Sequence, residues 1–459
     1  MKVFVSLLLA FVSALLSVAQ PRPGSERPNL IYVMVDDMGY ADIGPYGQKI
    51  IQTPHLDRMA REGIRFTDVY TGASVCAPSR SVLMTGQHLG HTRVRGNTAT
   101  TGGVLDQNRA RRVPLEPEDI TIAQVLKARG YITGMTGKWG LGEPGTTGEP
   151  NLKGFDEWFG FLNQNHAHTH YPDYLWRNQQ KVTIDANVAG KRGQHSHELF
   201  TNFAFEFIRR QSQQPFFLYL AYTLPHQEYA VPDLGPYADR PWTKDEQVYA
   251  AMLHLIDRDM GRLFALLKER GIDDKTVVFF CSDNGGARRN DGRFDSNAPF
   301  RGAKGDIFEG GLRTPMLVRW PGKIPAGATS NLPWTFADVL PTLADIAGAA
   351  VPPHLDGVSV LPSVLGKPQL LDRKLYWEQY SGGFQQAVRW GKWKAIRRQG
   401  KTASFDLYDL DSDIGETRNV APSHPDVVQE MAAFMATAHV PSPNWSRQTA
   451  AAPKAKKAP

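Results

Sequence analysis

The sequence predicts an α/β fold, with a large, mostly parallel sheet sandwiched by helices and a smaller C-terminal antiparallel sheet subdomain. Three observations support this prediction. Runs of apolar, β-forming residues are continuous rather than alternating, as in strands that are buried on both faces. Helical patterns separate these runs, which is the order typical of a parallel sheet. From about residue 370 the runs are short and separated by turns, which indicates an antiparallel sheet.

The individual elements follow from where these patterns begin and end. Several helical patterns stop at a glycine, such as Gly86 or Gly271, and glycine is a common helix stop. Strands are predicted at residues 29–35, 131–136, 215–222, 276–281 and 314–320. Helices are predicted at residues 55–62, 78–85, 121–129, 197–210, 244–270 and 335–347. The smaller subdomain has predicted strands at 375–377, 386–390, 393–396 and 405–410 and a helix at 425–438, while the loop-rich stretch 143–193 is expected to shape the pocket.

The two ends of the chain differ from the rest. Residues 1–20 contain one basic residue, Lys2, then an apolar run that ends in small residues, which predicts a signal peptide at residues 1–19. We therefore expect an exported protein, periplasmic or secreted. The apolar run is short for a membrane span, and no other segment is long and apolar enough to be one. The predicted catalytic domain covers residues 20–369, the C-terminal subdomain residues 370–440, and a disordered Ala/Pro/Lys tail residues 441–459.

Charge and cysteine content exclude some classes of protein. The formal net charge is +6, but four of the lysines lie in the predicted signal peptide and tail, so the folded part is close to neutral. This gives no support for nucleic-acid binding. The two cysteines, Cys76 and Cys281, could form one disulfide, which a core of this size does not need. Cys281 ends an apolar run and is interpreted as a small buried hydrophobic residue.

Polar residues stand directly after four of the predicted strands. Such residues matter because ligands bind at the carboxyl ends of the strands in parallel sheets. Asp36 and Asp37, Asp283 and Asn284 offer only hard oxygen ligands, which suit Ca²⁺ or Mg²⁺, and the absence of clustered histidines argues against zinc. An Asp-Asp pair alone is also a common cap or turn. The second oxygen-rich pair, in the same situation, favours a metal site.

The segment Val75-Cys76-Ala77-Pro78-Ser79-Arg80 places a cysteine at a predicted helix start. A helix N-terminus favours an anion beside Cys76, and Arg80 could point its guanidinium at the same place. Lys138 and Lys304 could stabilise charge on a tetrahedral anion, and His226 could protonate a leaving group. The alternative is a buried cysteine at an ordinary helix start, with solvated surface lysines.

These motifs resemble those of type I sulfatases in the alkaline-phosphatase-like superfamily. The resemblance runs from Pro28 to about Pro422. The pair Cys-x-Pro-x-Arg and Gly-Lys-Trp is its most specific part. The matching segments, in the family's order, are Asp36-Asp37-Met38-Gly39, Cys76 to Arg80 with Thr85-Gly86, Gly137-Lys138-Trp139, Pro225-His226, Ser282-Asp283-Asn284-Gly285 and the loop from Lys304 to Gly311.

The resemblance implies a catalytic centre built around residue 76. A formylglycine-generating maturation enzyme would oxidise Cys76 to formylglycine (3-oxoalanine), and one hydroxyl of its hydrated aldehyde would attack sulfur. Loss of a proton from the second hydroxyl would then expel sulfate. The implied roles are Ca²⁺ binding, preferred over Mg²⁺, by Asp36, Asp37, Asp283 and Asn284, nucleophile holding by Arg80 and Lys138, and sulfate binding by His226 and Lys304, with His226 protonating the departing sugar oxygen.

One position departs from the family pattern. Most members have histidine two residues after the motif lysine, where this chain has Gly140. The base for sulfate release is then unassigned, and His166, His168 or His170 could supply it. We prefer His168, here also a substrate-binding candidate, although a loop histidine without a role is the alternative. The motif Gly-Lys-Trp-Gly-Leu-Gly resembles sulfatases of sulfated polysaccharides, which suggests galactose or N-acetylgalactosamine sulfates, such as 4-sulfates, as substrates.

Two other functions compete with a sulfated-glycan sulfatase. A phosphate or phosphonate ester hydrolase could use the same fold, but such enzymes commonly carry Asp-His pairs that this chain lacks. Some phosphonate hydrolases also use formylglycine. The second alternative is a non-catalytic glycan-binding pseudoenzyme, which Gly140 supports and the intact Cys76–Arg80 motif opposes.

Overall fold

The computed structural model describes residues 27–211, 214–288, 292–399 and 403–446 of the 459. The predicted signal peptide, residues 1–19, lies outside the described residues. Among the described helices, none is both long and apolar enough to cross a membrane.

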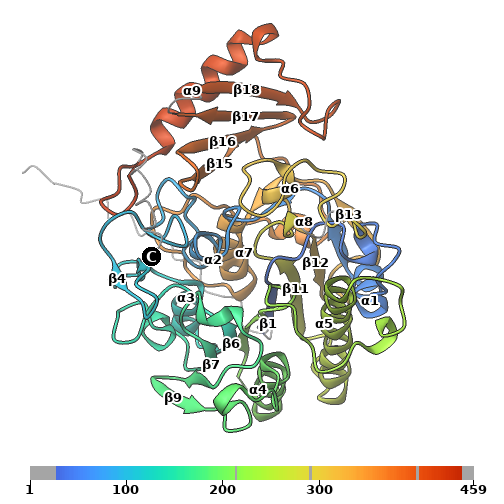
Figure 1. Ribbon diagram of the computed structural model, residues 1–459. Helices are drawn as coiled ribbons and strands as arrows, with labels where there is room; N and C mark the ends of the chain where they lie inside the picture. Colours follow the sequence, from blue (N-terminus) through green and yellow to red (C-terminus); the bar gives the residue numbers. More distant parts are fainter. Residues whose placement is uncertain (1–26, 212–213, 289–291, 400–402, 447–459) are drawn as a thin grey trace, which may run out of the picture.

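A ten-stranded sheet forms the centre of the large domain (Figure 1). Its strands lie in the order β13-β2-β12-β11-β1-β10-β6-β7-β8-β9. The five strands from β11 to β7 in this order are mutually parallel, and antiparallel strands flank them. The bounds are β1 Asn29–Val35, β2 Ile64–Phe66, β6 Ile132–Lys138, β7 Glu157–Phe161, β8 Tyr174–Arg177, β9 Gln180–Thr183, β10 Phe216–Ala221, β11 Thr276–Ser282, β12 Met316–Arg319 and β13 Ala328–Ser330. The short pairs β3 Val69–Tyr70 with β14 Trp334–Thr335 and β4 Val104–Leu105 with β5 Arg111–Arg112 lie apart from this sheet.

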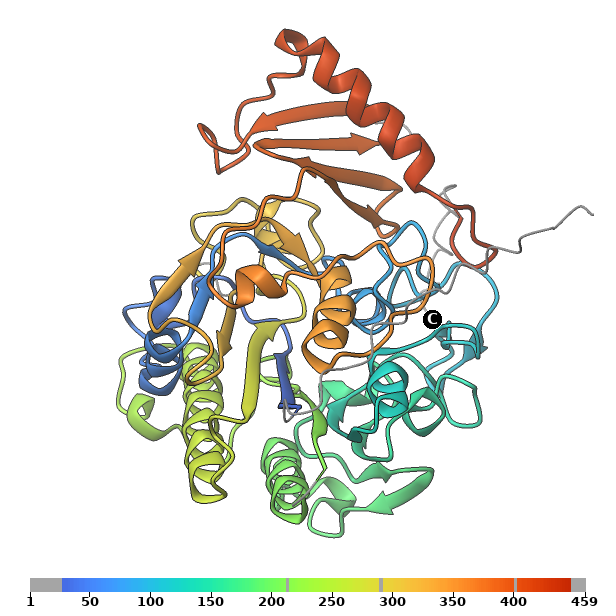
Figure 2. The same cartoon turned by 180° about the vertical axis from the view of Figure 1, so that it is seen from behind.

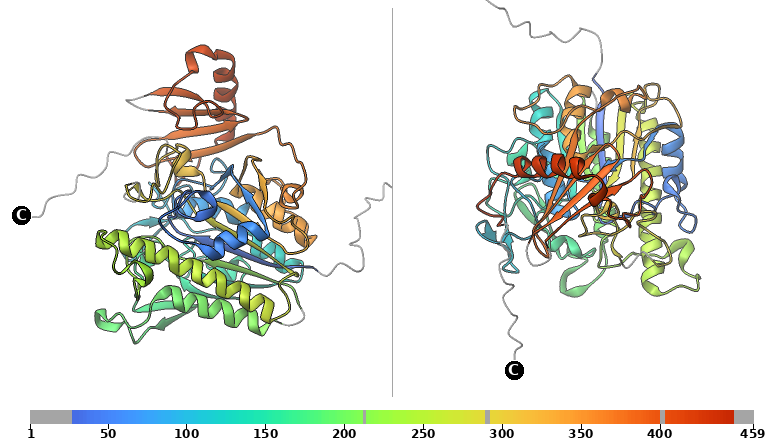
Figure 3. Two further views of the ribbon diagram at one scale, coloured as in Figure 1. Left: turned by 90° about the vertical axis from the view of Figure 1, so that its right-hand side faces the viewer. Right: turned by 90° about the horizontal axis from the view of Figure 1, so that it is seen from above.

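Helices cover both faces of this sheet, as the left view of Figure 3 shows. Successive side chains of a strand point to opposite faces, so β1 contributes to two cores. Ile31 and Val33 pack with α1, α4 and α5, whereas Leu30 and Tyr32 belong to the core with α2, α3 and α7. The bounds are α1 Pro54–Glu62, α2 Cys76–Thr85, α3 Ile122–Ala128, α4 Ser196–Arg210, α5 Lys244–Glu269, α6 Glu309–Leu312, α7 Val339–Ala347 and α8 Leu361–Val364.

The C-terminal subdomain is an antiparallel sheet of four strands, β15 Lys374–Gln379, β16 Gln385–Trp390, β17 Trp393–Arg398 and β18 Ser404–Asp409, with helix α9 Pro425–Ala438 on its outer face (Figures 1 and 3). Successive side chains of each strand again point to opposite faces of the sheet. Val388 and Leu407 pack against α9, while Ala387 and Ile396 join the core of the large domain. The smaller sheet is therefore held between α9 and the rest of the protein.

Most predicted elements lie within a few residues of the observed ones, and the predicted fold class is confirmed. The stretch 143–193 is loop-rich, and it also contains β7, β8 and β9. The predicted start of the tail needs correction. It does not begin at residue 441, because Trp445 is 2% exposed and its indole N–H donates to the carbonyl of Arg93 at 2.8 Å, so the C-terminal segment returns to the large domain (Figure 2). Residues from 447 onward lie outside the described part of the chain.

Candidate active site

Helix α2 carries the Cys76–Arg80 motif into the interior. Val75, extended, precedes the helix, and Gly86 ends it in the left-handed conformation (φ 69°). Every residue of the helix is buried, and Cys76 is 1% exposed. The Cys76 Sγ atom lies 3.4 Å from Asp36 Oδ1. The first turn of α2 therefore presents Cys76 to the end of strand β1.

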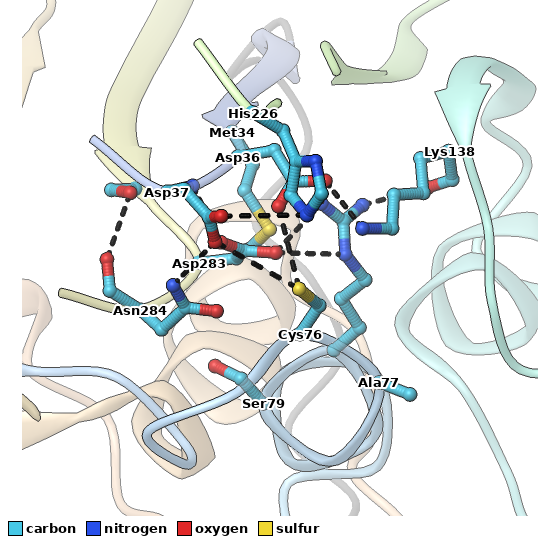
Figure 4. A network of polar contacts seen from close by, with 12 residues as sticks. Met34, Asp36, Asp37, Cys76, Ala77, Ser79, Lys138, His226, Asp283 and Asn284 are labelled. Atoms are coloured by element: carbon cyan, nitrogen blue, oxygen red, sulfur yellow. Dashed lines mark hydrogen bonds and ion pairs between the residues drawn. The ribbon is translucent and has the colours of Figure 1, made fainter. Parts of the chain in front are cut away.

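The carboxyl ends of neighbouring parallel strands meet at this point (Figure 4). Asp36 and Asp37 follow β1, and Asp283 and Asn284 follow β11 on one side of it. On the other side His226 follows β10, and Lys138 is the last residue of β6. All six side chains are at least 95% buried. The structure thus brings together the polar residues that the sequence places at four separate strand ends.

Four oxygen-bearing side chains form a group suited to a hard cation. Asp37 adopts a left-handed backbone (φ 68°), its N–H faces Asp283 Oδ1 at 3.2 Å, and its Oδ1 accepts from Asn284 Nδ2 at 2.8 Å. Asn284 Oδ1 is buried and has no hydrogen-bond partner among the described residues. An unpaired buried oxygen beside three carboxylates fits a Ca²⁺ ligand set. A non-glycine residue in this conformation is typical of functional sites.

Two lysines and a histidine face the same carboxylates. Lys138 Nζ lies 2.5 Å from Asp36 Oδ2, and Lys304 Nζ lies 2.6 Å from Asp37 Oδ2. His226 Nε2 is 3.4 Å from Asp37 Oδ2. Both lysines are therefore within reach of an anion bound beside Asp36 and Asp37.

Arg80 links helix α2 to two strand ends. Its Nη2 lies 2.8 Å from Asp283 Oδ2, and its Nη1 donates to the carbonyl of Lys138 at 2.7 Å. Arg80 is 1% exposed, so these contacts are shielded from water. They fix the guanidinium one turn along the helix from Cys76.

Burial and charge shift the pKa values of these groups in different directions. Burial alone would raise the pKa of Asp36, but Lys138 and His226 outweigh it, so that pKa lies well below its usual range. Burial and the neighbouring Asp36 raise the pKa of Asp283 to about 6. Burial also raises the pKa of the Cys76 thiol well above its ordinary value, so the unmodified side chain is a neutral thiol at pH 7.

The three candidate histidines of the 143–193 stretch occupy different places. The His168 ring stacks on His226, with ring centroids 4.4 Å apart. His170 Nε2 lies 2.9 Å from the carbonyl oxygen of His226, which makes it a support for that loop. His166 packs between Phe161 and Tyr174 instead. Of the three, His168 is the one whose ring lies against a side chain of the site.

Two residues at the site carry no sequence signal. Asn97 Oδ1 accepts from the backbone N–H of Ala77 at 2.9 Å and so supports the first turn of α2. Gln164, beyond the end of β7, places its amide against Gly140. Neither stands in a recognisable motif or directly at a predicted strand end, so only the folded chain identifies them.

Two models of known protein families match most of the chain. The model of the family described as Sulfatase matches residues 28–349, and that described as N-sulphoglucosamine sulphohydrolase, C-terminal, matches residues 303–440. The chain belongs to the sulfatase family. In this sulfatase the first model covers most of the α/β domain, and the second covers the last part of that domain together with the C-terminal sheet.

Named relatives cover most of this sulfatase. An N-acetylgalactosamine-6-sulfatase from Canis lupus familiaris is 35% identical over 415 residues, which cover 85% of this chain and 74% of that protein. Arylsulfatase A from Homo sapiens is 33% identical over 482 residues and covers 93% of this chain and 89% of its own. The crystal structure of Ps i-CgsB in complex with k-i-k-neocarrahexaose matches with a TM-score of 0.80 and 30% identity, covering 92% of this chain and 96% of that one.

Proposed function

We propose that this sulfatase hydrolyses the sulfate ester of a sulfated carbohydrate, with galactose or N-acetylgalactosamine sulfates as its substrate class. The observation that carries this proposal is the position of Cys76, whose sulfur lies 3.4 Å from Asp36 at the centre of the cationic and oxygen-rich side chains. A sulfated sugar is supported by the names of its relatives, which include N-acetylgalactosamine-6-sulfatases and a structure bound to k-i-k-neocarrahexaose.

The nucleophile in this proposal derives from Cys76. A maturation enzyme would oxidise it to formylglycine, whose hydrated aldehyde supplies a hydroxyl for attack on sulfur. Arg80 stands one turn along the same helix, and Lys138 contacts the same Asp36 carboxylate as Cys76. These two cations would favour an oxyanion at residue 76 over the neutral hydroxyl.

Calcium would be held by Asp36, Asp37, Asp283 and Asn284. Bound there, it would polarise an oxygen of the substrate and neutralise three carboxylates. Lys304 and His226, which both contact Asp37, would then be released to bind the sulfate group. The buried position of His226 strengthens such a contact, because the local dielectric is low, whereas the Lys304 side chain is 23% exposed.

Proton transfer falls to the two stacked histidines. His226 Nε2 lies 3.4 Å from Asp37 Oδ2 and its ring stacks on His168, and it would protonate the departing sugar oxygen. Burial lowers the pKa of His226, and the carboxylates of Asp37 and Asp36 oppose this shift, so the donor role depends on these two neighbours. His168 would accept the proton whose loss releases sulfate. Burial lowers the pKa of His168 to about 3, so its ring is neutral at pH 7 and can accept a proton, but only as a weak base.

Two measurements on one preparation test the proposal. Peptide mass spectrometry on the segment around residue 76, from protein exported by its native host, is expected to show an aldehyde in place of the thiol. Sulfate release from sulfated galactose and N-acetylgalactosamine is expected for this protein and absent for Cys76→Ala. An unmodified thiol, in a host that matures other sulfatases, would contradict the proposal, and so would equal turnover by Cys76→Ala.

A further inference from the structure

The side chain of Gln164 is buried without hydrogen bonds. The residue is 3% exposed, and neither its Oε1 nor its Nε2 has a partner among the described residues. Its neighbour Asn163 is fully paired: Nδ2 donates to Glu143 and Asp106 at 2.6 and 3.2 Å, and Oδ1 accepts two backbone N–H groups. Leaving a buried amide unpaired is unfavourable, so the Gln164 amide indicates a partner that the described side chains do not supply, which is either a buried water or a group of a ligand.

The position of Gln164 shows where that partner would bind. Strands β6 and β7 are parallel, and their ends stay in register, because Trp139 N donates to Phe161 O at 2.9 Å and Gly140 N to Leu162 O at 3.1 Å. Gln164 therefore leaves β7 at the edge of the sheet where the active-site residues lie. Across the adjacent strands β11, β1, β10, β6 and β7, the carboxyl ends lead into Asp283, Asp36, His226, Lys138 and Gln164 respectively.

Gly140 locates the amide relative to the ionic cluster. A methyl group built on Gly140 would lie 2.4 Å from Gln164 Oε1, so the amide fills the space that a side chain at position 140 would take. Gly140 comes two residues after Lys138, whose Nζ lies 2.5 Å from Asp36. The Gln164 amide thus takes the place of a side chain from the end of β6.

We propose that the Gln164 amide binds a hydroxyl group in this active site, an inference that rests on the proposed sulfatase function. An amide offers a donor and an acceptor, and a hydroxyl can satisfy both at once, whereas a sulfate oxygen only accepts. Two hydroxyls are available: one on the hydrated aldehyde at residue 76, and one on the sugar next to the sulfate ester. Because an amide does not titrate near neutral pH, Gln164 binds and does not act as a base.

The substitution Gln164→Met tests this inference, because methionine keeps the volume and removes both polar atoms. Activity is measured on sulfated N-acetylgalactosamine and on 4-nitrophenyl sulfate, which has no hydroxyl group. We expect kcat/KM on the sugar sulfate to fall about tenfold to a hundredfold, the usual effect of a lost buried hydrogen bond. The melting temperature should stay or rise, because the substitution removes an unpaired buried amide.

The matched control is Gln386→Met in the C-terminal sheet. Gln386 is also fully buried, but its amide is paired: Nε2 donates to the Met435 carbonyl at 2.9 Å, and Oε1 accepts from Arg397 Nε at 2.8 Å. The same substitution should therefore lower the melting temperature there and leave kcat/KM unchanged. Opposite effects at the two glutamines would separate ligand binding from a structural role.

Each outcome decides the question. An equal loss on both substrates assigns the hydroxyl to residue 76, and a loss confined to the sugar sulfate assigns it to the sugar. Unchanged kcat/KM on the sugar sulfate, or a loss that accompanies a lowered melting temperature, would overturn the inference while leaving the proposed function intact. If the unsubstituted protein, with an aldehyde at residue 76, hydrolyses no sulfate ester, the proposed function fails and this inference fails with it.

Discussion

At position 140 a single missing side chain makes room for the Gln164 amide, and this predicts a steric coupling between the two residues. Gly140→Ala should destabilise the protein, because the new methyl would stand 2.4 Å from Gln164 Oε1 and the backbone has φ 77°. The left-handed conformation alone costs alanine about 1 kcal/mol. Urea unfolding measures the total loss.

Gly145 is the matched control for that substitution. It has nearly the same conformation, φ 79°, but nothing lies within 4 Å of an added methyl group. Gly145→Ala should therefore cost only the conformational part. The additional destabilisation of Gly140→Ala over Gly145→Ala should disappear when Gln164 is also replaced by alanine. An equal loss of stability at both glycines would show that the contact with Gln164 carries no energy.

The contrast between His168 and His166 gives a second prediction at single residues. His168→Ala should lower kcat about a hundredfold or more, the usual contribution of a general base, because its ring lies on His226. His166→Ala should leave kcat nearly unchanged, because His166 packs between Phe161 and Tyr174. Steady-state kinetics on a sulfated sugar decides between them, and similar kcat values for the two variants would remove His168 from the mechanism.

The unpaired side-chain oxygen of Asn284 leads to a prediction about calcium binding. Its unpaired, buried Oδ1 stands beside the carboxylates, so Ca²⁺ should raise the melting temperature of chelator-treated protein. At a hundredfold excess over the dissociation constant the gain is about 2.7 kcal/mol. Asn284→Ala should need a higher calcium concentration for the same gain. A melting temperature that ignores both EDTA and Ca²⁺ would contradict the metal assignment.

At the scale of elements, a buried ionic cluster joins the C-terminal sheet to the large domain. Lys394 on β17 lies 2.6 Å from Glu309 Oε1 at the start of α6, and Arg313 Nε lies 2.5 Å from Glu309 Oε2. Glu309 and Lys394 are fully buried. Lys394 and the two arginines beside Glu309, Arg313 and Arg389, hold the pKa of Glu309 well below its usual range against the effect of burial.

Removing the charge of Glu309 should therefore destabilise this junction strongly. Glu309→Gln leaves buried cations short of their partner, which typically costs about 3–5 kcal/mol in urea unfolding. The control is the exposed pair Lys374–Glu430, 2.7 Å apart, with the Glu430 side chain 53% exposed. Glu430→Gln should cost less than about 1 kcal/mol. Equal losses in the free energy of unfolding for the two variants would show that burial does not strengthen the ion pairs of Glu309.

Some helices and strands could be predicted from the sequence and others could not. Fully buried strands such as β1 and long amphipathic helices such as α5 are visible in local pattern and are found within a residue or two. Strand β9 is missed because all four of its residues are exposed, so it has no apolar signal and exists only through pairing with β8. The strand-end residues are predictable because a motif or an apolar run precedes each. Gln164 could not be predicted from the sequence, since its amide lies against Gly140, which follows strand β6.

For the whole molecule, buried and partly buried histidines predict acid sensitivity. Burial lowers the pKa of His88 and of His170 to about 4, and that of His195 to about 2. The unfolded chain protonates these residues below about pH 6.5 while the folded protein keeps them neutral, so stability falls as pH drops from about 6.5. Each of these histidines can lower the free energy of unfolding by up to about 1.4 kcal/mol for each pH unit of acidification. Burial raises the pKa of Glu143 and of Glu416 to about 7 and that of Asp257 and of Asp283 to about 6, and these four shifts act in the opposite direction.

Urea unfolding between pH 7 and pH 5 measures this effect. His195→Gln should reduce the slope of stability against pH, because His195 Nε2 faces the Ala230 carbonyl at 3.1 Å and its Nδ1 accepts from His197 N, so the neutral ring is fully paired. Stability that rises on acidification, or an unchanged slope in the variant, would contradict the prediction.

The burial of Cys76 bears on the maturation step that the proposed function requires. With 1% of the residue exposed inside a fully buried helix, the thiol is closed to a protein the size of a modifying enzyme. Oxidation of Cys76, as proposed, would then have to precede closure of the sheet around α2. Synthesis would become a race between two rates, and chains that fold first would keep the thiol. Faster folding would lower, not raise, the fraction of matured protein.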